Sequence, residues 1–380
     1  MDQWEEQEKT TVVLNYLGRK GGGAVYAYEM AKGLVENGCQ VYAIVSKDIE
    51  NISLWGQLAL AQLICVETYR SAATFVTGIV RFLLWDQWKL KRIFRGVSID
   101  ACYVPMIQPW SGLVNRHFKD APLFVTLHDP IAHSGTPWIT RTIYRRVAKA
   151  ADVIILLSSR FLEYTASAYH KGISDIHVIP HGVFDYYEKL PTSLVVKRTA
   201  GTNFLFFGRI TPYKGLHLLA EAYARLKREG YDVSLSIVGS GDLSEYISEF
   251  SAEEDVVVDN RFLPDEDVFP YFRGERIVTV LPYLDATQSG VVPIAMLAQS
   301  LLIATDTGGL REQTCDGRYA ILCEPNACSL YEAMKEAALH HDSYRQMLTE
   351  AEGYIRSLSW DKLSGQLVDL FKKYTAEDAS

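Results

Sequence analysis

The stretch that decides the fold is residues 204–215, which read FLFFGRITPYKG. Its apolar start is typical of a buried strand, and the amphipathic stretch that follows Gly215 predicts a helix. The loop between them carries a guanidinium, on Arg209, and an ammonium, on Lys214. Two cations at the start of a helix oppose the helix dipole unless an anion joins them. The loop is therefore either a phosphate site, in which Arg can bind two oxygens at once, or a solvated turn.

Strand-like runs alternate with helical patterns on both sides of this loop. The first series of expected strands is residues 11–17, 40–45, 101–105, 123–127, 153–157 and 177–179. The second series is residues 204–207, 234–238, 256–258, 278–282, 301–305 and 320–322. The pattern predicts an α/β fold with two doubly wound, Rossmann-like domains that face each other across a cleft. A polar segment, residues 186–203, separates the series, so we place the domains at residues 1–185 and 186–355.

The composition is that of a folded, soluble protein, with 380 residues, 48% of them hydrophobic and 22% charged. The six cysteines show no CxxC or Cys/His spacing, which indicates reduced thiols in the cytoplasm. The acidic N-terminus, MDQWEEQEK, does not resemble the basic start of a signal peptide. The uncharged run at residues 286–305 contains polar residues and a proline, so we do not interpret it as a membrane span.

The net charge of −8 is uneven, because the acidic excess falls in residues 186–380. No region is basic enough to indicate a nucleic-acid partner. Residues 75–94 combine aromatic and aliphatic side chains with Arg and Lys, which is typical of a helix lying on a membrane surface. Two interpretations stay open: a weak contact of the N-terminal domain with the inner face of the membrane, or core helices whose charges face water.

Two further turns could approach an anion. The turn Gly21-Gly22-Gly23 lies between an expected strand and an expected helix, where backbone N–H groups can meet a phosphate. After the expected strand 278–282 come four residues with possible anion donors: Thr287, Gln288, Ser289 and Gly290. The simpler interpretations are a tight turn for the first and a helix cap for the second.

Two histidines lie at expected strand ends, His128 after residues 123–127 and His181 after residues 177–179. A lone histidine is more often structural than catalytic. The run Asp265-Glu266-Asp267 precedes a helical stretch, and acidic residues at a helix start explain it better than a metal does. We therefore expect no metal site, and the spacing offers no Ser/His/Asp set.

Taken in order, these motifs resemble the GT-B retaining glycosyltransferases of the "glycosyl transferases group 1" class, family 4-like. The resemblance covers nearly the whole chain. Its motifs are the glycine turn at 21–23, HVIPHGV at 177–183, FGRITPYKG at 207–215, IVGSGDL at 237–243, IATDTGGLRE at 303–312 and SWDKL at 359–363. Their order and spacing together are highly specific.

The resemblance implies roles for single residues in binding a nucleotide-sugar donor. Arg209 and Lys214 would bind its diphosphate, which the turn at Gly22 and Gly23 would approach. His128 would contact the donor sugar.

The resemblance also implies which residues contact the nucleotide base and what structure the C-terminal segment has. Arg261 and Phe262 would meet the nucleotide base through their backbone. The closing segment, residues 356–380, would be a helix that crosses back to the N-terminal domain.

One departure from the family pattern concerns a pair of glutamates, one near the sugar and one on the ribose. The corresponding positions here are Ala286 and Ile294. The chain instead resembles a subgroup in which the Thr-Gln-Ser-Gly turn, residues 287–290, keeps the phosphate cradle. Ile294 cannot donate to or accept from a ribose, so nucleoside recognition differs from the usual pattern.

The function implied by the resemblance is a retaining, metal-independent hexosyltransferase. Its donor would be UDP- or GDP-linked, with no other cofactor, and its acceptor a glycan or a lipid-linked sugar in cell-surface polysaccharide synthesis. The enzyme would be cytoplasmic, with a peripheral contact to the inner face of the membrane. The alternatives are a non-catalytic GT-B scaffold subunit, or another GT-B enzyme such as a phosphorylase or a nucleotide-sugar epimerase.

Overall fold

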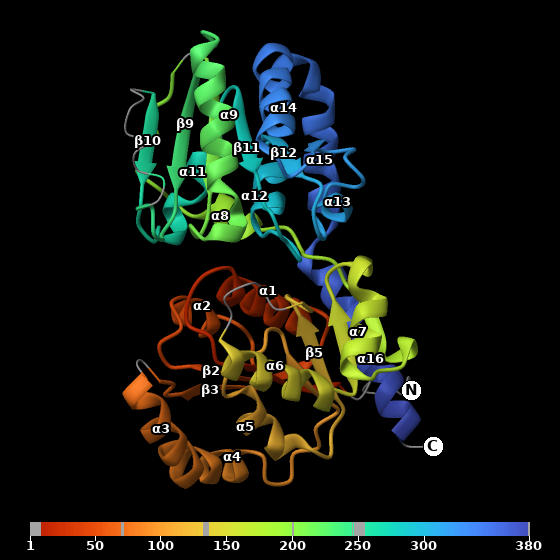
Figure 1. The fold of residues 1–380 in the computed structure, drawn as a ribbon. Coiled ribbons are helices and arrows are strands. Elements are labelled where there is room, and N and C mark those ends of the chain that lie inside the picture. The colour runs from red at the N-terminus through yellow and green to blue at the C-terminus, as the bar shows by residue number, and fades with distance from the viewer. Residues whose placement is uncertain are drawn as a thin grey trace, which may run out of the picture. The chain divides into compact units, whose positions relative to one another are not determined.

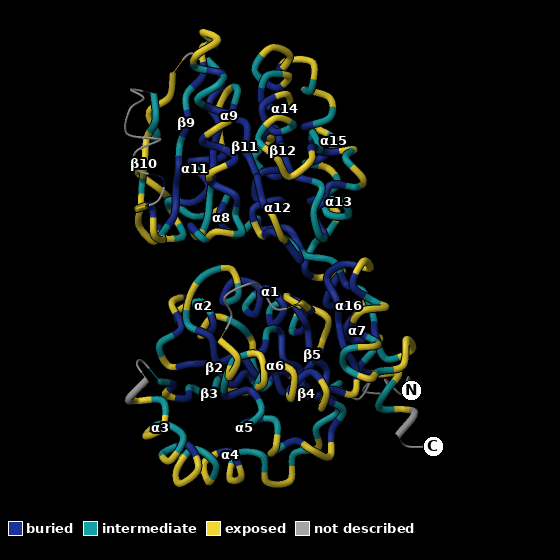
Figure 2. The backbone as a smooth tube through the Cα atoms, in the orientation of Figure 1, coloured by how far each residue is buried: buried dark blue, intermediate teal, exposed yellow. Residues whose placement is uncertain are grey.

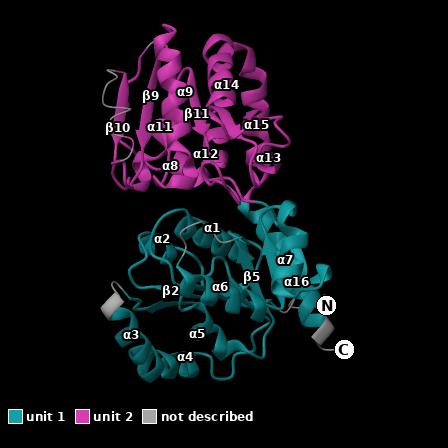
Figure 3. Cartoon of the chain, in the orientation of Figure 1, with its two compact units in different colours: residues 1–180, 360–380 teal, residues 181–359 magenta. Residues whose placement is uncertain are grey.

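The chain folds into two compact units, shown in Figure 3. The computed structural model describes residues 9–69, 72–131, 137–199, 201–244, 246 and 255–378. Unit 1 comprises Met1–Pro180 and Trp360–Ser380, and unit 2 comprises His181–Ser359. The chain passes between the units twice. The first crossing falls five residues before the boundary expected at residue 185, and the second falls four residues after the one expected at residue 355.

Unit 1 is built on a seven-stranded parallel sheet in the order β3-β2-β1-β4-β5-β6-β7. Its strands are β1 (Thr11–Tyr16), β2 (Gln40–Ser46), β3 (Gln62–Val66), β4 (Ala101–Val104), β5 (Leu123–Leu127), β6 (Val153–Leu156) and β7 (Ile176–Val178). Val12 of β1 pairs with Val41 on one side and with Ala101 on the other. Parallel strands need crossover connections, and the helices of unit 1 supply them (Figure 1).

The helices of unit 1 cover both faces of this sheet. They are α1 (Gly22–Glu36), α2 (Ile52–Trp55), α3 (Ala72–Arg81), the π-helical η1 (Phe82–Asp86), α4 (Gln87–Ile93), α5 (Ser111–Asn115), η2 (Arg116–Phe118), α6 (Trp138–Ala150), η3 (Ser159–Phe161), α7 (Leu162–Tyr169), η4 (Ile173–Asp175) and α16 (Trp360–Asp378). On one face Val13 shares a core with Phe82 and Trp110. On the other, Phe124 packs edge-on against Phe371 of α16, with ring centres 4.7 Å apart.

Unit 2 has a six-stranded parallel sheet in the order β10-β9-β8-β11-β12-β13. Its strands are β8 (Thr202–Phe207), β9 (Val233–Val238), β10 (Val256–Asp259), β11 (Ile277–Leu281), β12 (Leu301–Thr305) and β13 (Ile321–Cys323). Strands β11 and β12 are buried throughout, as Figure 2 shows.

The helices of unit 2 are α8 (Asp185–Lys189), η5 (Pro212–Lys214), α9 (Leu216–Arg228), η6 (Asp265–Asp267), α11 (Phe269–Phe272), α12 (Val291–Leu297), α13 (Leu310–Gln313), α14 (Ala327–His340), η7 (His341–Tyr344) and α15 (Arg345–Ser357). Helices α9 and α14 share a core with the strands through Leu219, Leu226 and Met334. Within the described residues of both units, no helix has the length and apolar character needed to cross a bilayer.

The segment expected as a linker, residues 186–203, packs on unit 2. Tyr186 donates a hydrogen bond to Asp265 (3.1 Å), and Arg198 donates to the carbonyl oxygen of Pro270 (2.6 Å). The prediction placed the boundary there because the segment is polar and contains proline and glycine. Its polar side chains instead bond to the surface of unit 2.

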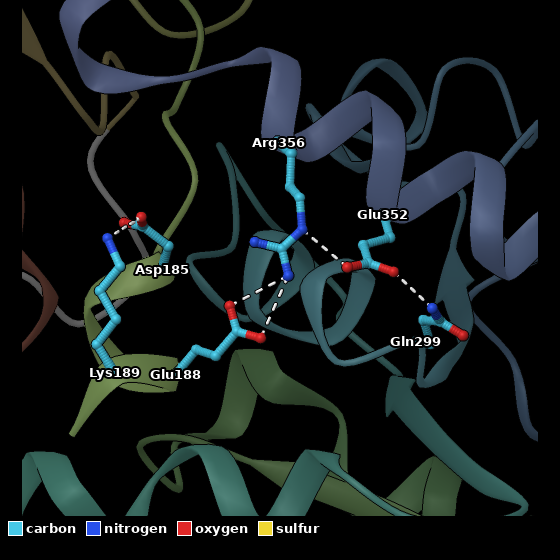
Figure 4. A network of polar contacts seen from close by, with 6 residues as sticks. All are labelled: Asp185, Glu188, Lys189, Gln299, Glu352 and Arg356. Atoms are coloured by element: carbon cyan, nitrogen blue, oxygen red, sulfur yellow. Dashed lines mark hydrogen bonds and ion pairs between the residues drawn. The ribbon is translucent and has the colours of Figure 1, made fainter. Parts of the chain in front are cut away.

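The two stretches of unit 2 that adjoin the crossings are bonded to each other. The amide of Val183 donates to the carbonyl of Leu358 (3.0 Å). Figure 4 shows Arg356 of α15 between two carboxylates, 3.1 Å from Glu188 of α8 and 2.8 Å from Glu352. Glu352 also accepts from Gln299 at 2.5 Å. The two ends of unit 2 are thereby connected close to the points where the chain leaves it.

The predicted architecture of two doubly wound parallel sheets is confirmed. One strand was missed, β3, because its sequence QLICV is a short edge strand with neither clear alternation nor a long apolar run. The first helix begins at Gly22, two residues before the expected start. Gly22 and Gly23 therefore form the start of α1, and Gly21 is its N-cap.

Replacing Gly33 of α1 by alanine should destabilise unit 1. An added Cβ would lie 2.3 Å from Ser364 Oγ and 2.7 Å from the carbonyl oxygen of Trp360, so α16 would have to move away from α1. We expect the free energy of unfolding to fall by about 1–3 kcal/mol, the usual effect of overpacking. Thermal unfolding measures it.

The matched control is Gly353→Ala in α15, where no atom lies within 4 Å of the added Cβ. Alanine there should be neutral or stabilising, because it favours the helix. The same response from both variants would contradict the packing argument.

Candidate active site

The candidate site lies at the carboxyl edge of the sheet in unit 2, where the loops after β8, β11 and β12 meet. The amide of Leu284 donates to the carbonyl of Tyr213 (2.8 Å), which joins the first two loops. The amide of Gly309 donates to the carbonyl of Ala286 (3.0 Å), which joins the last two. This is the edge at which ligands bind in open α/β sheets.

Two glycines allow these close approaches, and Gly215 is the first along the chain. Its φ is +66°, and a Cβ on it would lie 1.9 Å from the carbonyl oxygen of Pro282. Gly308 is similar, with a φ of +52° and only 1.4 Å between an added Cβ and the carbonyl oxygen of Ala286. The three loops can therefore meet only with glycine at these two positions.

Lys214 points from η5 to the loop after β11. Its ammonium donates a hydrogen bond to the Tyr283 hydroxyl (2.5 Å) and lies 3.9 Å from the centre of that ring. Burial raises the pKa of Tyr283 above its usual value, so the hydroxyl stays protonated. Because Lys214 can only donate, the Tyr283 proton is left for Ser289 Oγ, 3.1 Å away.

Arg209 lies in the same loop and is exposed. A Cβ placed on the neighbouring Gly208 would be 3.8 Å from the Lys214 ammonium, so the two cationic residues adjoin along the loop. No carboxylate in the described part of the chain neutralises Arg209. The structure thus brings together the two cations that the sequence singled out.

Two buried polar atoms of the meeting loops have no hydrogen-bond partner among the described residues. They are Thr211 Oγ1, between the two cations in sequence, and Gln288 Oε1 in the turn after β11. More than nine in ten buried polar groups are normally satisfied. A hydrogen-bonding ligand at this edge would account for both.

The turn at residues 287–290 is more constrained than expected. Thr287 and Ser289 are buried, and Gly290 is exposed just before α12. The amide of Ser289 donates to Gln313 Oε1 (2.8 Å), and Gln313 Nε2 donates back to the Ser289 carbonyl (3.3 Å). We expected the Ser289 amide to face a phosphate, but in this structure it is already hydrogen-bonded to the Gln313 side chain.

Arg261 and Phe262 follow β10 and lie two strands away from β8. The Arg261 side chain is bonded to Asp259 (2.8 Å) and lies 3.7 Å from Asp267. Its amide donates to the carbonyl of Asp259 (3.1 Å). Phe262 is 52% exposed. The side chain of Arg261 is thus neutralised, although both it and the Phe262 ring are open to solvent.

The positions of the missing glutamates are both buried, with Ala286 2% and Ile294 4% exposed. Ala286 contacts the loop after β12 through its carbonyl, as described above. Ile294 lies in α12, where every residue is buried. Neither position presents a polar side chain to the edge of the sheet.

The remaining expected residues lie in unit 1. Gly22 has no atom within 4 Å of an added Cβ, whereas a Cβ on Gly23 would lie 2.7 Å from Met106 Sδ. The amide of Gly21 donates to a carboxylate oxygen of Glu50 (2.5 Å). A carboxylate of the chain thus binds at the start of α1, where the sequence predicted a phosphate, and the local pattern gave no sign of Glu50.

His128 follows β5, and its ring packs edge-on against the ring of Tyr26, with the ring centres 4.6 Å apart. Its Nε2 lies 2.9 Å from the carbonyl oxygen of Pro105, which can only accept, so Nε2 carries the proton. Burial lowers the pKa of His128, which keeps the ring neutral near pH 7. His128 would therefore present an unprotonated Nδ1 to a ligand.

Tyr283 and Gln313 are the residues of the site that the sequence did not indicate. Tyr283 follows β11 by two positions, which could have marked it as a strand-end residue. Gln313 lies in α13 and is paired with Ser289, 24 residues away, so no local signal exists.

A large cavity in unit 2 lies elsewhere. It has a volume of about 880 Å³ and is lined by residues that precede β11 and β12, among them Arg276 and Gln299, together with His341. This is the amino edge of the sheet, opposite the meeting loops. Among the described residues, no three His, Cys, Asp or Glu side chains gather in the way a metal site requires.

Comparison with known proteins agrees with the fold. The "Glycosyltransferase Family 4" profile matches residues 20–184, and "Glycosyl transferases group 1" matches residues 201–340. Glycogen synthase of Mycobacterium tuberculosis is 24% identical over 223 residues, which cover 55% of this chain. The match spans 52% of that protein, so the chain spans about half the length of the curated relatives it matches.

Two solved structures share the fold. Sucrose-phosphate synthase from Thermosynechococcus elongatus has a TM-score of 0.72 and 17% identity, covering 97% of this chain and 100% of that one. HepE of Anabaena in complex with UDP-glucose has a TM-score of 0.69 and 16% identity, covering 96% and 100%. The two sheets therefore define a GT-B protein. Within that class, residues 201–340 are of the glycosyl transferases group 1 type and residues 20–184 of the glycosyltransferase family 4 type.

Replacing Tyr283 by phenylalanine tests whether that hydroxyl positions Lys214. The change removes one hydrogen bond to Lys214 and one to Ser289 but keeps the ring under the ammonium. We expect nucleoside-diphosphate affinity to fall by about 1–2 kcal/mol, because two modest hydrogen bonds are lost. Calorimetric titration measures it. Tyr319→Phe, on a tyrosine outside the meeting loops, is the control, and equal effects of both changes would contradict the role.

Proposed function

We propose that the protein is a retaining hexosyltransferase. It would move a hexose from a UDP- or GDP-linked donor to a glycan or lipid-linked acceptor, in cell-surface polysaccharide synthesis. It would work in the cytoplasm, with a peripheral contact to the inner face of the membrane. The observation that carries the proposal is the position of Arg209 and Lys214 in one loop that also contains a buried polar atom with no partner among the described residues, Thr211 Oγ1; Gln288 Oε1 in the adjoining loop is a second such atom.

The proposed chemistry is charge stabilisation at a leaving diphosphate. The bond between the sugar and the β-phosphate breaks, and negative charge builds on the phosphate oxygens. Arg209 and Lys214 would lie against that charge, and preorganised cations of this kind act most strongly where charge develops. The acceptor hydroxyl forms the new bond and gives its proton to the leaving phosphate. Because the two cations are covalent parts of the loop, a bound metal is not required for this step.

Donor-sugar recognition would fall to unit 1. His128 would accept a hydrogen bond from a sugar hydroxyl at its unprotonated Nδ1, since Nε2 donates to Pro105. Gly22 is open enough for a ligand to approach the backbone. The base would meet the backbone near Arg261 and Phe262. The turn from Thr287 to Gly290 would complete the phosphate cradle through donors other than the Ser289 amide, which Gln313 holds.

The second candidate is a non-catalytic subunit that binds a nucleotide sugar or acts as a scaffold. The apolar, buried residues Ala286 and Ile294 favour it. A screen of nucleotide-sugar hydrolysis across common donors separates the two. Release of UDP or GDP from any donor supports the enzyme. No release from any donor, and no transfer, supports the scaffold.

Arg209→Ala and Lys214→Ala should each lower kcat strongly. Each variant lacks one of the two cations that would stabilise the negative charge on the leaving phosphate. We expect a loss of about 2–4 kcal/mol of transition-state stabilisation. Arg228→Ala, at an exposed cation of the same unit in α9, is the control and should be close to wild type. Wild-type turnover in both loop variants would refute the assignment.

Activity should survive treatment with EDTA, because the proposed charge stabilisation comes from side chains. The assay compares initial rates with and without chelator at the same ionic strength. Complete loss of activity that magnesium restores would overturn the metal-independent mechanism.

A further inference from the structure

The helical segment α3–η1–α4 has two apolar faces, and the fold uses one of them. On the inner face Phe82 and Leu90 are buried, at 0% and 1% exposure. Phe75, Ile79 and Ile93 pack against the same core of unit 1. These contacts account for the attachment of the segment to the sheet.

The second apolar face, here called the outer stripe, points to solvent. Its six members are Val76 (64% exposed), Val80 (51%), Leu83 (44%), Leu84 (61%), Trp85 (66%) and Trp88 (64%). Four of them recur at every fourth residue, so they lie along one side of the helix. Figure 2 shows the outer turns of α3 and α4 as exposed. Large apolar side chains gathered on a surface in this way mark an interaction site.

Cations border the outer stripe. Four exposed basic residues follow it in sequence: Lys89, Lys91, Arg92 and Arg95. The guanidinium of Arg92 lies 5.6 Å from the centre of the Trp88 ring. Residues 72–96 contain five Arg and Lys and a single carboxylate, Asp86, which lies 3.5 Å from Arg81. The free charge beside the stripe is therefore positive.

Lys91 also adds positive charge toward η2. Burial and the nearby Lys91 lower the pKa of His117, so Lys91 acts electrostatically on that part of unit 1. Arg116 and Lys119, on either side of His117, are exposed as well. The basic surface thus extends from α4 to η2.

We propose that the outer stripe and its basic border dock unit 1 on an anionic lipid surface. Tryptophan favours the membrane–water interface, and aliphatic groups beside Lys and Arg are what an interfacial helix needs. A second copy of the chain fits less well, because a two-fold dimer through this face would bring the same cations together. The inference rests on α3, η1 and α4 alone and does not depend on the nucleotide site of unit 2.

Co-sedimentation with vesicles tests the proposal on the full chain. Vesicles of phosphatidylglycerol mixed with phosphatidylcholine are compared with phosphatidylcholine alone, at low and high salt. Each Lys or Arg near an anionic surface raises affinity about fivefold, and salt weakens this effect. We expect binding to the anionic vesicles at low salt and much weaker binding at high salt or to neutral vesicles.

Two double variants separate the apolar from the charged contribution. Trp85→Ser with Trp88→Ser, and Lys89→Glu with Arg92→Glu, should each weaken vesicle binding by about tenfold or more. All four side chains are exposed, so the fold should persist. Melting temperature and nucleoside-diphosphate titration confirm that both units are intact.

The matched controls lie in unit 2, where Leu339→Ser changes a residue 54% exposed and Arg228→Glu reverses an exposed cation. Both should bind vesicles like wild type. Three results would overturn the proposal: no binding at low salt, equal binding to neutral vesicles, or unchanged binding by both double variants. If the wild-type protein does not bind vesicles but forms a dimer, and the Trp85/Trp88 double variant does not dimerise, the outer stripe binds a second copy of the chain instead.

Discussion

The close approach of Gly215 to the carbonyl oxygen of Pro282 is the constraint on which the site of unit 2 depends. It brings the loop after β8 against the loop after β11, with only 1.9 Å between an added Cβ and that oxygen. Lys214, the next residue back along the chain, can then reach Tyr283, and Tyr283 reaches Ser289. Any larger residue at Gly215 would separate the loops and remove Lys214 from the turn after β11.

The architecture and the cationic loop could be predicted from the sequence because both are local patterns. Strands and helices alternate with clear periodicities, and Arg209 and Lys214 lie within one short loop between them. The partners of these residues could not be predicted. Gln313 bonds to Ser289 across 24 residues, and Glu50 bonds to the Gly21 amide across 29. Such contacts depend on tertiary structure, which a single sequence does not encode in any local pattern.

The segment of α3, η1 and α4 shows a different limit of sequence reasoning. Apolar residues occupy both faces of this helix, so periodicity cannot say which face is buried. The structure shows which face is which, because Phe82 is buried while Trp85 and Trp88 are more than 60% exposed. Core packing thus explains the inner face and leaves the outer stripe to be explained by an interaction.

Calorimetric titration with UDP and with GDP tests the central claim most directly, because the claim is that the meeting loops of unit 2 bind a nucleoside diphosphate. We predict that one of the two binds at one site per chain and that Arg209→Ala and Lys214→Ala weaken its binding. Salt should weaken it as well, since two cations contribute. Failure of both nucleotides to bind, or binding that neither variant changes, would contradict the account.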